Sequence, residues 1–209
     1  MNVVLFGASG MIGSRILQEL VARGHSVTAA VRDTAKVPVM AGVTTKRGDV
    51  LDVDSVATNV KGSDAVISAY APGFETLGNL VLATQSLIAG LQKAGVRRFL
   101  MVGGAGSLEV APGLQLVDAP DFPAAWKGIA LAHRDALNVL KGSDLDWTSL
   151  SPAALIEPGV RTGKFRLGTD QLVMDDKGES KISAEDFAVA AVDELEKNAH
   201  VRQRFTLGY

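Results

Sequence analysis

The sequence predicts an α/β protein with a doubly wound parallel sheet, and two observations support this. Short apolar runs typical of strands alternate with segments of helical periodicity along the whole chain. A glycine-rich turn, Gly7 to Gly13, joins the first apolar run to the first helical segment. Parallel strands require crossover connections, and helices that serve as crossovers cover both faces of the sheet. With 209 residues, the chain is expected to form a single domain over residues 1–209.

The positions of the elements follow from this alternation. The predicted strands occupy residues 3–6, 26–31, 44–47, 65–69, 98–102, 147–150 and 203–207. The predicted helices occupy residues 11–22, 53–60, 76–94, 124–140 and 184–197. Gly24, Gly62 and Gly95 fall between elements, where turns and helix ends favour glycine. Two irregular stretches, 103–123 and 152–178, follow strands and are therefore expected to form substrate-side loops.

The composition excludes several kinds of partner and site. A net charge of −2 offers no basic surface for the phosphates of nucleic acid. The chain has no cysteine, which excludes disulfides, thiolate metal sites and cysteine nucleophiles, and its three histidines are scattered. It has neither the layout of a signal peptide nor an apolar run long enough to span a membrane. These features predict a cytoplasmic protein that binds neither nucleic acid nor membranes.

The glycine-rich turn predicts an anion site. A strand that runs through a tight turn into a helix directs free backbone N–H groups and the positive end of the helix dipole toward one point. In the stretch LFGASGMIGSRI, Gly7 would allow the tight turn and Gly10 would let a pyrophosphate approach the main chain. Gly13 would let the helix pack closely on the strand. Ser9 can add a hydroxyl to the phosphate shell.

The residue after the second strand indicates which dinucleotide is preferred. An acidic residue there accepts hydrogen bonds from the ribose hydroxyls of NAD, whereas an arginine pairs with the 2′-phosphate of NADP. Arg32 has this position in TAAVRDT, which favours NADP(H) over NAD(H). Asp33 follows directly and would reverse the preference if its side chain, rather than that of Arg32, faced the ribose. A solvated charge at the strand end is the alternative interpretation of Arg32.

Residues after the later strands complete the predicted cofactor site. Asp49 follows the third strand and is expected to receive the adenine amino group, with plain turn chemistry as the alternative. Residues 69–71 follow the fourth strand and are expected to pass beneath the cofactor. The predicted cofactor-binding set is Gly7, Ser9, Gly10, Met11, Ile12, Gly13, Arg32, Asp49, Val50, Ala69, Tyr70, Ala71 and Gly103.

Motifs distributed over essentially the full chain carry a family resemblance. They are GASGMIG, VRD, GDV, DAVISAYAPG, LSPAALIEPG and ISAEDFAVAAVDELE. They resemble the atypical short-chain dehydrogenase/reductase superfamily in its NAD(P)H-binding subgroup, which is similar to flavin reductase/biliverdin reductase B and nitrogen-metabolite-repressor-like proteins. PGVRTGKFRLGTD and RFTLGY resemble small bacterial members described as NADH-flavin reductase or epimerase-like. The resemblance implies a Rossmann sheet with strand order 3-2-1-4-5-6-7 and a nicotinamide ring near the ends of the fourth to sixth strands.

The sequence departs from this family at its usual proton donor. The resemblance implies a Tyr-x-x-x-Lys pair on the helix after the fifth strand, in which the lysine lowers the pKa of the tyrosine. The matching helix has Trp126 at the tyrosine position and Ala130 at the lysine position, with Lys127 on a different face. Two glycines displace the serine expected after the fifth strand, and Ser107 lies downstream. Ser107 and Trp126 are the candidate catalytic residues, and alcohol dehydrogenation or sugar epimerisation is not expected.

A nicotinamide site without that pair can still transfer hydride to an acceptor whose reduced form takes its proton from solvent. Flavins and quinones are such acceptors, and holding two flat rings face to face supplies most of the catalysis. Phe74, Leu108, Phe122 and Trp126 are candidates for the second face of this sandwich, with ordinary packing as the alternative. The sequence thus predicts an NADPH-dependent reductase of a flat aromatic acceptor, with flavin as substrate rather than bound cofactor.

Other interpretations complete the expectations. A non-enzymatic NAD(P)H sensor that acts through a protein partner would also lack the catalytic pair and is the alternative function. The sequence is compatible with a homo-oligomer. His133 is interpreted as a surface or core-edge residue of its helix. Arg161, Lys164 and Arg166 are interpreted as solvent-facing side chains, with contact to an anionic acceptor as the alternative.

Overall fold

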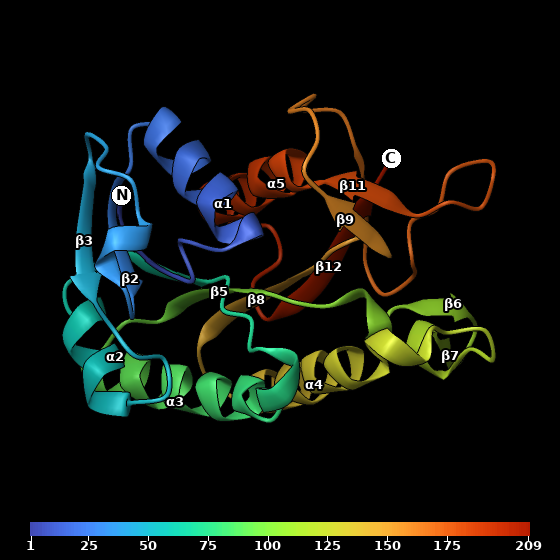
Figure 1. Cartoon of the computed structure of the whole chain (residues 1–209), viewed down its shortest axis with the longest axis horizontal. Helices are drawn as coiled ribbons and strands as arrows, with labels where there is room; N and C mark the ends of the chain where they lie inside the picture. The colour runs from blue at the N-terminus through green and yellow to red at the C-terminus, as the bar shows by residue number, and fades with distance from the viewer.

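The computed structural model describes residues 1–209 and contains a central sheet of eight strands (Figure 1). The strands are β1 (Asn2–Phe6), β2 (Ser26–Val31), β3 (Val43–Arg47), β4 (Ala65–Ser68), β5 (Arg98–Val102), β8 (Asp146–Ser151), β10 (Arg166–Gly168) and β12 (Gln203–Gly208). Their order across the sheet is β10-β12-β8-β5-β4-β1-β2-β3. All neighbouring strands are parallel except β10 and β12. The seven predicted strands therefore follow the predicted order, and β10 adds an antiparallel edge strand that was too short to be predicted.

Five helices cover the two faces of this sheet. Helices α1 (Met11–Ala22) and α5 (Ala184–Lys197) lie together on one face, and α2 (Val53–Val60), α3 (Asn79–Ala94) and α4 (Ala124–Lys141) lie on the other (Figure 1). Two hydrophobic clusters, of 25 and 20 buried residues, fill the spaces between the helices and the two faces. Because both faces are buried to a similar extent, the central strands β1, β4 and β5 are largely apolar rather than alternating, whereas β8 also buries Thr148, Ser149 and Ser151.

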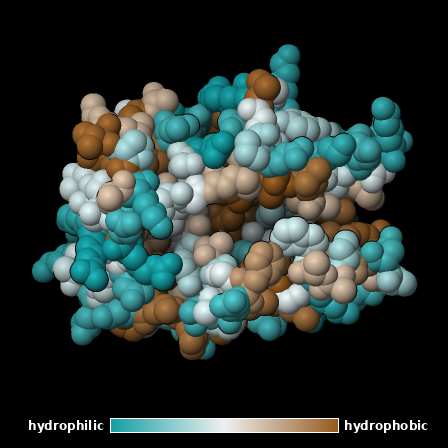
Figure 2. Space-filling view, viewed as in Figure 1, coloured by the Kyte–Doolittle hydropathy of each residue, from teal (hydrophilic) through white to brown (hydrophobic).

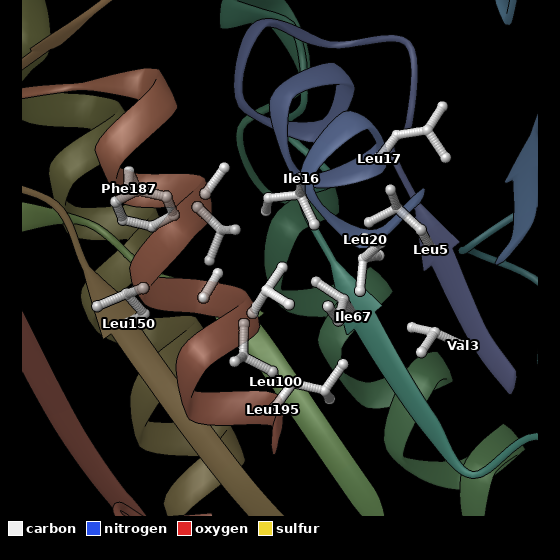
Figure 3. Packing of buried hydrophobic residues seen from close by; sticks show 14 of the residues in the cluster. Val3, Leu5, Ile16, Leu17, Leu20, Ile67, Leu100, Leu150, Phe187 and Leu195 are labelled. Atoms are coloured by element: carbon white, nitrogen blue, oxygen red, sulfur yellow. The ribbon is translucent and has the colours of Figure 1, made fainter. Parts of the chain in front are cut away.

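The cluster under α1 and α5 shows how the first βα unit is fixed. Ile16, Leu17 and Leu20 lie on the inner side of α1 and pack toward Leu5 and Ile67 of the sheet (Figure 3). Their spacing along the chain places them on one helical face. This packing fixes the N-terminus of α1 beside the carboxyl ends of β1 and β4.

Capping residues account for the helix boundaries. Asp52 caps α2 by accepting hydrogen bonds from the amides of Asp54 and Ser55, and Ser183 caps α5 by accepting one from the amide of Asp186. Helix α3 ends at Gly95, whose φ of +72° is in the left-handed region. It begins at Asn79, three residues after the predicted start, because a 3₁₀ turn, Phe74–Thr76, precedes it.

Both irregular stretches contain short strands that the sequence does not reveal. The first holds the hairpin of β6 (Glu109–Ala111) and β7 (Leu114–Gln115). The second contributes β9 (Leu155–Glu157), which pairs in parallel with β11 (Lys181–Ser183). Strands of two or three residues are too short to show periodicity.

Arg161 is exposed, in agreement with its interpretation as a solvent-facing side chain, and its guanidinium also pairs with a buried carboxylate. Nε and Nη2 of Arg161 each donate a hydrogen bond of 2.8 Å to the carboxylate of Glu19 on α1. Glu19 is buried and also accepts from Nε of Arg23 at 2.8 Å. Arg161 therefore ties the loop after β9 to α1, since a buried carboxylate requires such partners.

None of the helices combines the length and the apolar character needed to cross a bilayer.

Candidate active site

The glycine-rich turn between β1 and α1 has three glycines with different structural requirements. Gly7 has a φ of +78°, and a Cβ there would lie 2.5 Å from the carbonyl oxygen of Ala69. A Cβ at Gly13 would lie 2.0 Å from the carbonyl oxygen of Gly7. At Gly10 the nearest atom would be the same oxygen at 3.4 Å, an ordinary contact. The fold thus requires glycine at positions 7 and 13 and leaves the space beside Gly10 open.

The N-terminus of α1 is equipped to receive an anion. Gly10 is the N-cap, in extended conformation (φ −79°, ψ 171°), and no side chain caps the helix. The first turn contains no acidic residue. The first amides of a helix have no intrahelical partner, so here they remain available to a ligand, and the helix dipole favours a negative charge.

A groove of about 190 Å³ runs from this turn along the carboxyl ends of β1, β2 and β4. Its lining includes nine residues of the predicted cofactor set, namely Gly7, Ser9, Gly10, Arg32, Asp49, Val50, Ala69, Tyr70 and Ala71. Arg32 lines the groove, whereas Asp33 does not. Oδ1 of Asp33 accepts a hydrogen bond from the amide of Ala35 at 3.1 Å and caps the short 3₁₀ helix Thr34–Lys36.

Asp49 combines turn chemistry with a place in the groove. Its Oδ1 accepts a hydrogen bond from the amide of Leu51 at 2.9 Å, and its own amide donates to Oγ of Ser55 at 2.9 Å. The side chain is exposed and lines the groove beside Val50. The turn that the sequence suggested as an alternative is therefore present, and it fixes the carboxylate at the edge of the groove.

A second, largely apolar cavity of about 350 Å³ continues from the groove. Gly10, Ala69, Tyr70 and Ala71 line both spaces, so the two form one continuous track. Met11, Ile12 and Gly103 of the predicted set line the second cavity. Figure 2 shows this face of the molecule hollowed near its centre, with apolar residues in the hollow. The volume is within the range of small-molecule sites.

Tyr70 lies where the groove and the cavity meet. It is half-buried, and this burial raises the pKa of its hydroxyl above the ordinary value of 10.0. Arg32 and Asp49 act on it in opposite directions, the arginine lowering and the carboxylate raising the pKa. The side chain therefore remains a neutral phenol at physiological pH, as a wall of the track rather than a charged group.

One face of α4 forms a wall of the cavity. Trp126, Ile129, Ala130 and His133 follow the i, i+3, i+4, i+7 spacing of a single helical face, and all four line the cavity. Trp126 is 55% exposed, and its ring lies 5.6 Å from the ring of Phe74, which is 63% exposed. Exposed aromatic side chains at the mouth of an apolar cavity are typical of a binding site.

His133, interpreted from the sequence as a surface or core-edge residue, is half-buried and lines the cavity. Nδ1 of its imidazole is enclosed, whereas the residue as a whole keeps part of its surface accessible. Burial lowers the pKa of His133 to about 4, so the ring is neutral at physiological pH. A lone histidine on a helix gives no signal for this placement, because its neighbours come from loops distant in the sequence.

Four of the predicted residues lie outside both linings, namely Gly13, Phe74, Ser107 and Leu108. Gly13 contacts the main chain of Gly7 and supports the turn. The Ser107 hydroxyl accepts a hydrogen bond of 2.9 Å from Nη1 of Arg204, which removes it from the cavity. Leu108 is fully buried and lines neither space, so it does not form a second face for a flat ligand.

A family model described as NAD(P)H-binding matches residues 7–198. The chain belongs to this family. The matched region includes the residues that line the turn, the groove and the cavity. NAD(P)H-binding members of the atypical short-chain dehydrogenase/reductase type are therefore the relatives of this chain, as its motifs predicted.

Relatives within this NAD(P)H-binding family match over nearly the whole chain. The Bacillus subtilis protein YwnB, described as uncharacterised, is 42% identical over 213 residues, which cover 99% of this chain and 98% of YwnB. The structure of a candidate epimerase from Bacteroides thetaiotaomicron has a TM-score of 0.93 and 45% identity, covering 100% of this chain and 96% of its own. That of a candidate NADH-flavin reductase from Streptococcus pneumoniae has a TM-score of 0.88 and 35% identity, covering 100% and 99%. The family is thus oxidoreductase-like, with a reductase among its neighbours.

Proposed function

We propose that this protein is an NADPH-dependent reductase that transfers hydride to a flavin or quinone. The observation that carries the proposal is the continuity of the two spaces at Gly10 and Tyr70. One space has an uncapped helix N-terminus and an arginine, which suit a phosphorylated nucleotide. The other is apolar and aromatic, which suits a second flat ring.

The residues present fit a dinucleotide. The open space beside Gly10 and the free amides of α1 would hold the pyrophosphate, and the Ser9 hydroxyl would add a hydrogen bond. When bound, the reduced nicotinamide supplies the hydride. The walls of the cavity, which include Ile12, Phe122 and Trp126, would reduce the access of water and align the acceptor ring. Because the nicotinamide and the acceptor are held together, hydride transfer becomes in effect a unimolecular step.

The preference for NADPH over NADH rests on Arg32. Arg32 lines the groove, and the neighbouring carboxylate of Asp33 is engaged in a capping hydrogen bond. An arginine pairs with a 2′-phosphate through charge-assisted hydrogen bonds, and no carboxylate at this strand end competes for the ribose. This arrangement supports recognition of the 2′-phosphate by Arg32.

The nature of the acceptor rests on the ionisable groups of the cavity. Its lining contains no lysine and no carboxylate, and its titratable side chains are those of Tyr70 and His133. Ala130 and Trp126 stand at the positions where the family resemblance implies lysine and tyrosine. Flavins and quinones take the proton of reduction from solvent, so they suit such a site better than a sugar or an alcohol does. The room for a second ring also favours a reductase over a sensor.

The test is rapid mixing of NADPH and protein with FMN or with menadione, followed through the absorbance of the reduced nicotinamide. Oxidation should exceed the protein-free rate, and the Gly10→Val variant should return it to that rate. The folded state of the variant is checked by circular dichroism. NADPH that binds but is not oxidised by either acceptor would contradict the reductase and leave the sensor as the better reading.

A further inference from the structure

His133 has an unusual environment for a histidine in a cavity wall. A Cβ at Gly104 would lie 2.7 Å from the Cβ of His133, so the glycine makes room for the imidazole. Nδ1 is fully enclosed and has no hydrogen-bond partner. Nε2 makes no hydrogen bond to the protein and, unlike Nδ1, is not fully enclosed. Buried polar groups are nearly always paired, so the unpaired Nδ1 is unusual, but no ligand can reach it. Nε2 is the nitrogen of this ring that remains accessible to a ligand.

The protonation state of the ring follows from its surroundings. Tyr70 is the other titratable side chain in the lining, and no charged group faces the cavity. Burial lowers the pKa of His133 to about 4. A neutral imidazole carries one N–H and one lone pair. We assign the proton to Nε2, because an N–H at the enclosed Nδ1 would have no acceptor.

We propose that His133 donates a hydrogen bond from Nε2 to a ring oxygen of the acceptor, and thereby selects planar acceptors that carry a carbonyl over those that do not. The inference rests on the proposed function for the place of the acceptor. Trp126 and Ile129, the apolar residues beside His133 on α4, supply contact area but do not determine how a flat ring is oriented. A single N–H at a fixed point orients a flat ring within its plane, which stacking alone cannot do.

The hydrogen bond also assists the reaction itself. Reduction of a quinone takes up a hydride from the reduced nicotinamide and a proton from water, and negative charge develops on the carbonyl oxygen before that proton arrives. A fixed N–H donor in an apolar cavity stabilises this charge more strongly than it stabilises the neutral carbonyl. His133 keeps its own proton, since its neutral N–H is a weak acid. The rate should therefore not follow a titration of His133 between pH 6 and pH 8, because its pKa of about 4 is below that interval.

The experiment compares two planar ligands by calorimetric titration of the protein loaded with NADP⁺. They are menadione, which has ring carbonyls, and 2-methylnaphthalene, which has the same ring system and no hydrogen-bond acceptor. The oxidised nucleotide prevents turnover, so the readout is equilibrium binding. His133→Leu should weaken the binding of menadione about tenfold or more, as loss of a hydrogen bond in a dry site does, and that of 2-methylnaphthalene less than about threefold. His133→Gln, which retains an N–H near the position of Nε2, should restore most of the menadione affinity. Asp135→Ala, an exposed neighbour on α4, is the matched control.

Each outcome decides the inference. Equal losses for both ligands in His133→Leu, or none, would overturn it, and so would a wild-type protein that binds neither ligand. If His133→Leu does not fold, the contrast between His133→Gln and His133→Ala replaces it. Selective loss of menadione in a protein that never oxidises NADPH would contradict the proposed function while upholding His133 as the carbonyl-binding residue.

Discussion

The N-terminal turn of α1 is in contact with the end of β1 through two glycines, Gly13 and Gly7. A Cβ at Gly13 would lie 2.0 Å from the Gly7 carbonyl oxygen, a distance that no side chain tolerates. Gly10, between them in the sequence, has no such contact. The same motif therefore holds glycines that the fold requires and one that it leaves free for a ligand.

This contrast predicts opposite phenotypes. Gly13→Ala should lower the free energy of unfolding by about 3 kcal/mol, because the added Cβ must displace backbone. Gly10→Val should change stability by less than about 0.5 kcal/mol and weaken dinucleotide binding at least tenfold, because an extended backbone accepts valine while the side chain fills the anion site. Urea unfolding and nucleotide titration measure the two quantities. Gly78→Val, at a site where a Cβ meets nothing within 4 Å, is the control, and unchanged NADPH affinity in Gly10→Val would refute the anion site.

Arg32→Ala is expected to weaken the binding of NADPH by roughly 10-fold to 100-fold, because a charge-assisted hydrogen bond contributes about 1.5–3 kcal/mol. The affinity for NADH, which lacks the 2′-phosphate, should change little. Calorimetric titration with both nucleotides gives the ratio. Asp33→Ala removes the adjacent charge and the cap of Ala35 but should leave the ratio unchanged. Equal losses of NADPH and NADH in Arg32→Ala would show that the phosphate is not recognised there.

Glu19 is expected to make stability depend on pH in the acid range. The hydrogen bonds from Arg161 are the largest influence on Glu19 and lower its pKa below the ordinary 4.5, and Arg23 adds to this effect. A carboxyl whose pKa is lowered on folding stabilises the protein above its ordinary pKa, and this contribution is lost as the pH falls through the lowered value. Glu19→Gln should cost about 2 kcal/mol at pH 7.

Urea unfolding of wild type and Glu19→Gln across the acid range measures this effect. The stability difference between them should shrink as the pH drops below 4.5. Removal of the exposed Lys181–Glu179 pair by Lys181→Ala should leave the free energy of unfolding nearly unchanged and serves as the control. A stability difference that stays constant with pH would show that Glu19 is not responsible.

Two neighbouring hydroxyls of β8 should respond differently to removal. Ser149 is buried and its hydroxyl has no partner, whereas Thr148 accepts from Nη1 of Arg98 at 2.8 Å and donates to the carbonyl of His200 at 2.8 Å. Ser149→Ala should leave the free energy of unfolding unchanged or raise it by up to about 1 kcal/mol, because an unsatisfied buried hydroxyl is destabilising. Thr148→Val should lower it by about 2 kcal/mol. Thermal and urea unfolding decide, and a larger loss in Ser149→Ala than in Thr148→Val would reveal an unrecognised partner.

The sequence was sufficient for the succession of strands and helices along the chain and for the groove, and the family resemblance implied the order of the strands across the sheet. Buried parallel strands and their crossover helices leave patterns in local residue order, and Gly7, Gly10 and Arg32 lie at fixed offsets from the ends of β1 and β2. A cap such as the one Ser183 provides is local as well, because its hydrogen bond joins residues three positions apart. Gly7, Gly10 and Arg32 could therefore be placed in the turn or the groove from the sequence. Their positions depend only on neighbouring residues in the chain and on the topology common to such sheets.

The tertiary structure alone decided the cavity and the roles of the residues that lie far apart in the sequence. His133, Gly104 and Trp126 form one wall because α4 packs across the end of β5, and the lone histidine gave no signal of this. Arg161 meets Glu19 across 142 positions, and Ser107 is bonded to Arg204 across 97. Periodicity and propensity report the local backbone, whereas burial, desolvation and ion pairing depend on contacts that form only when distant segments fold together.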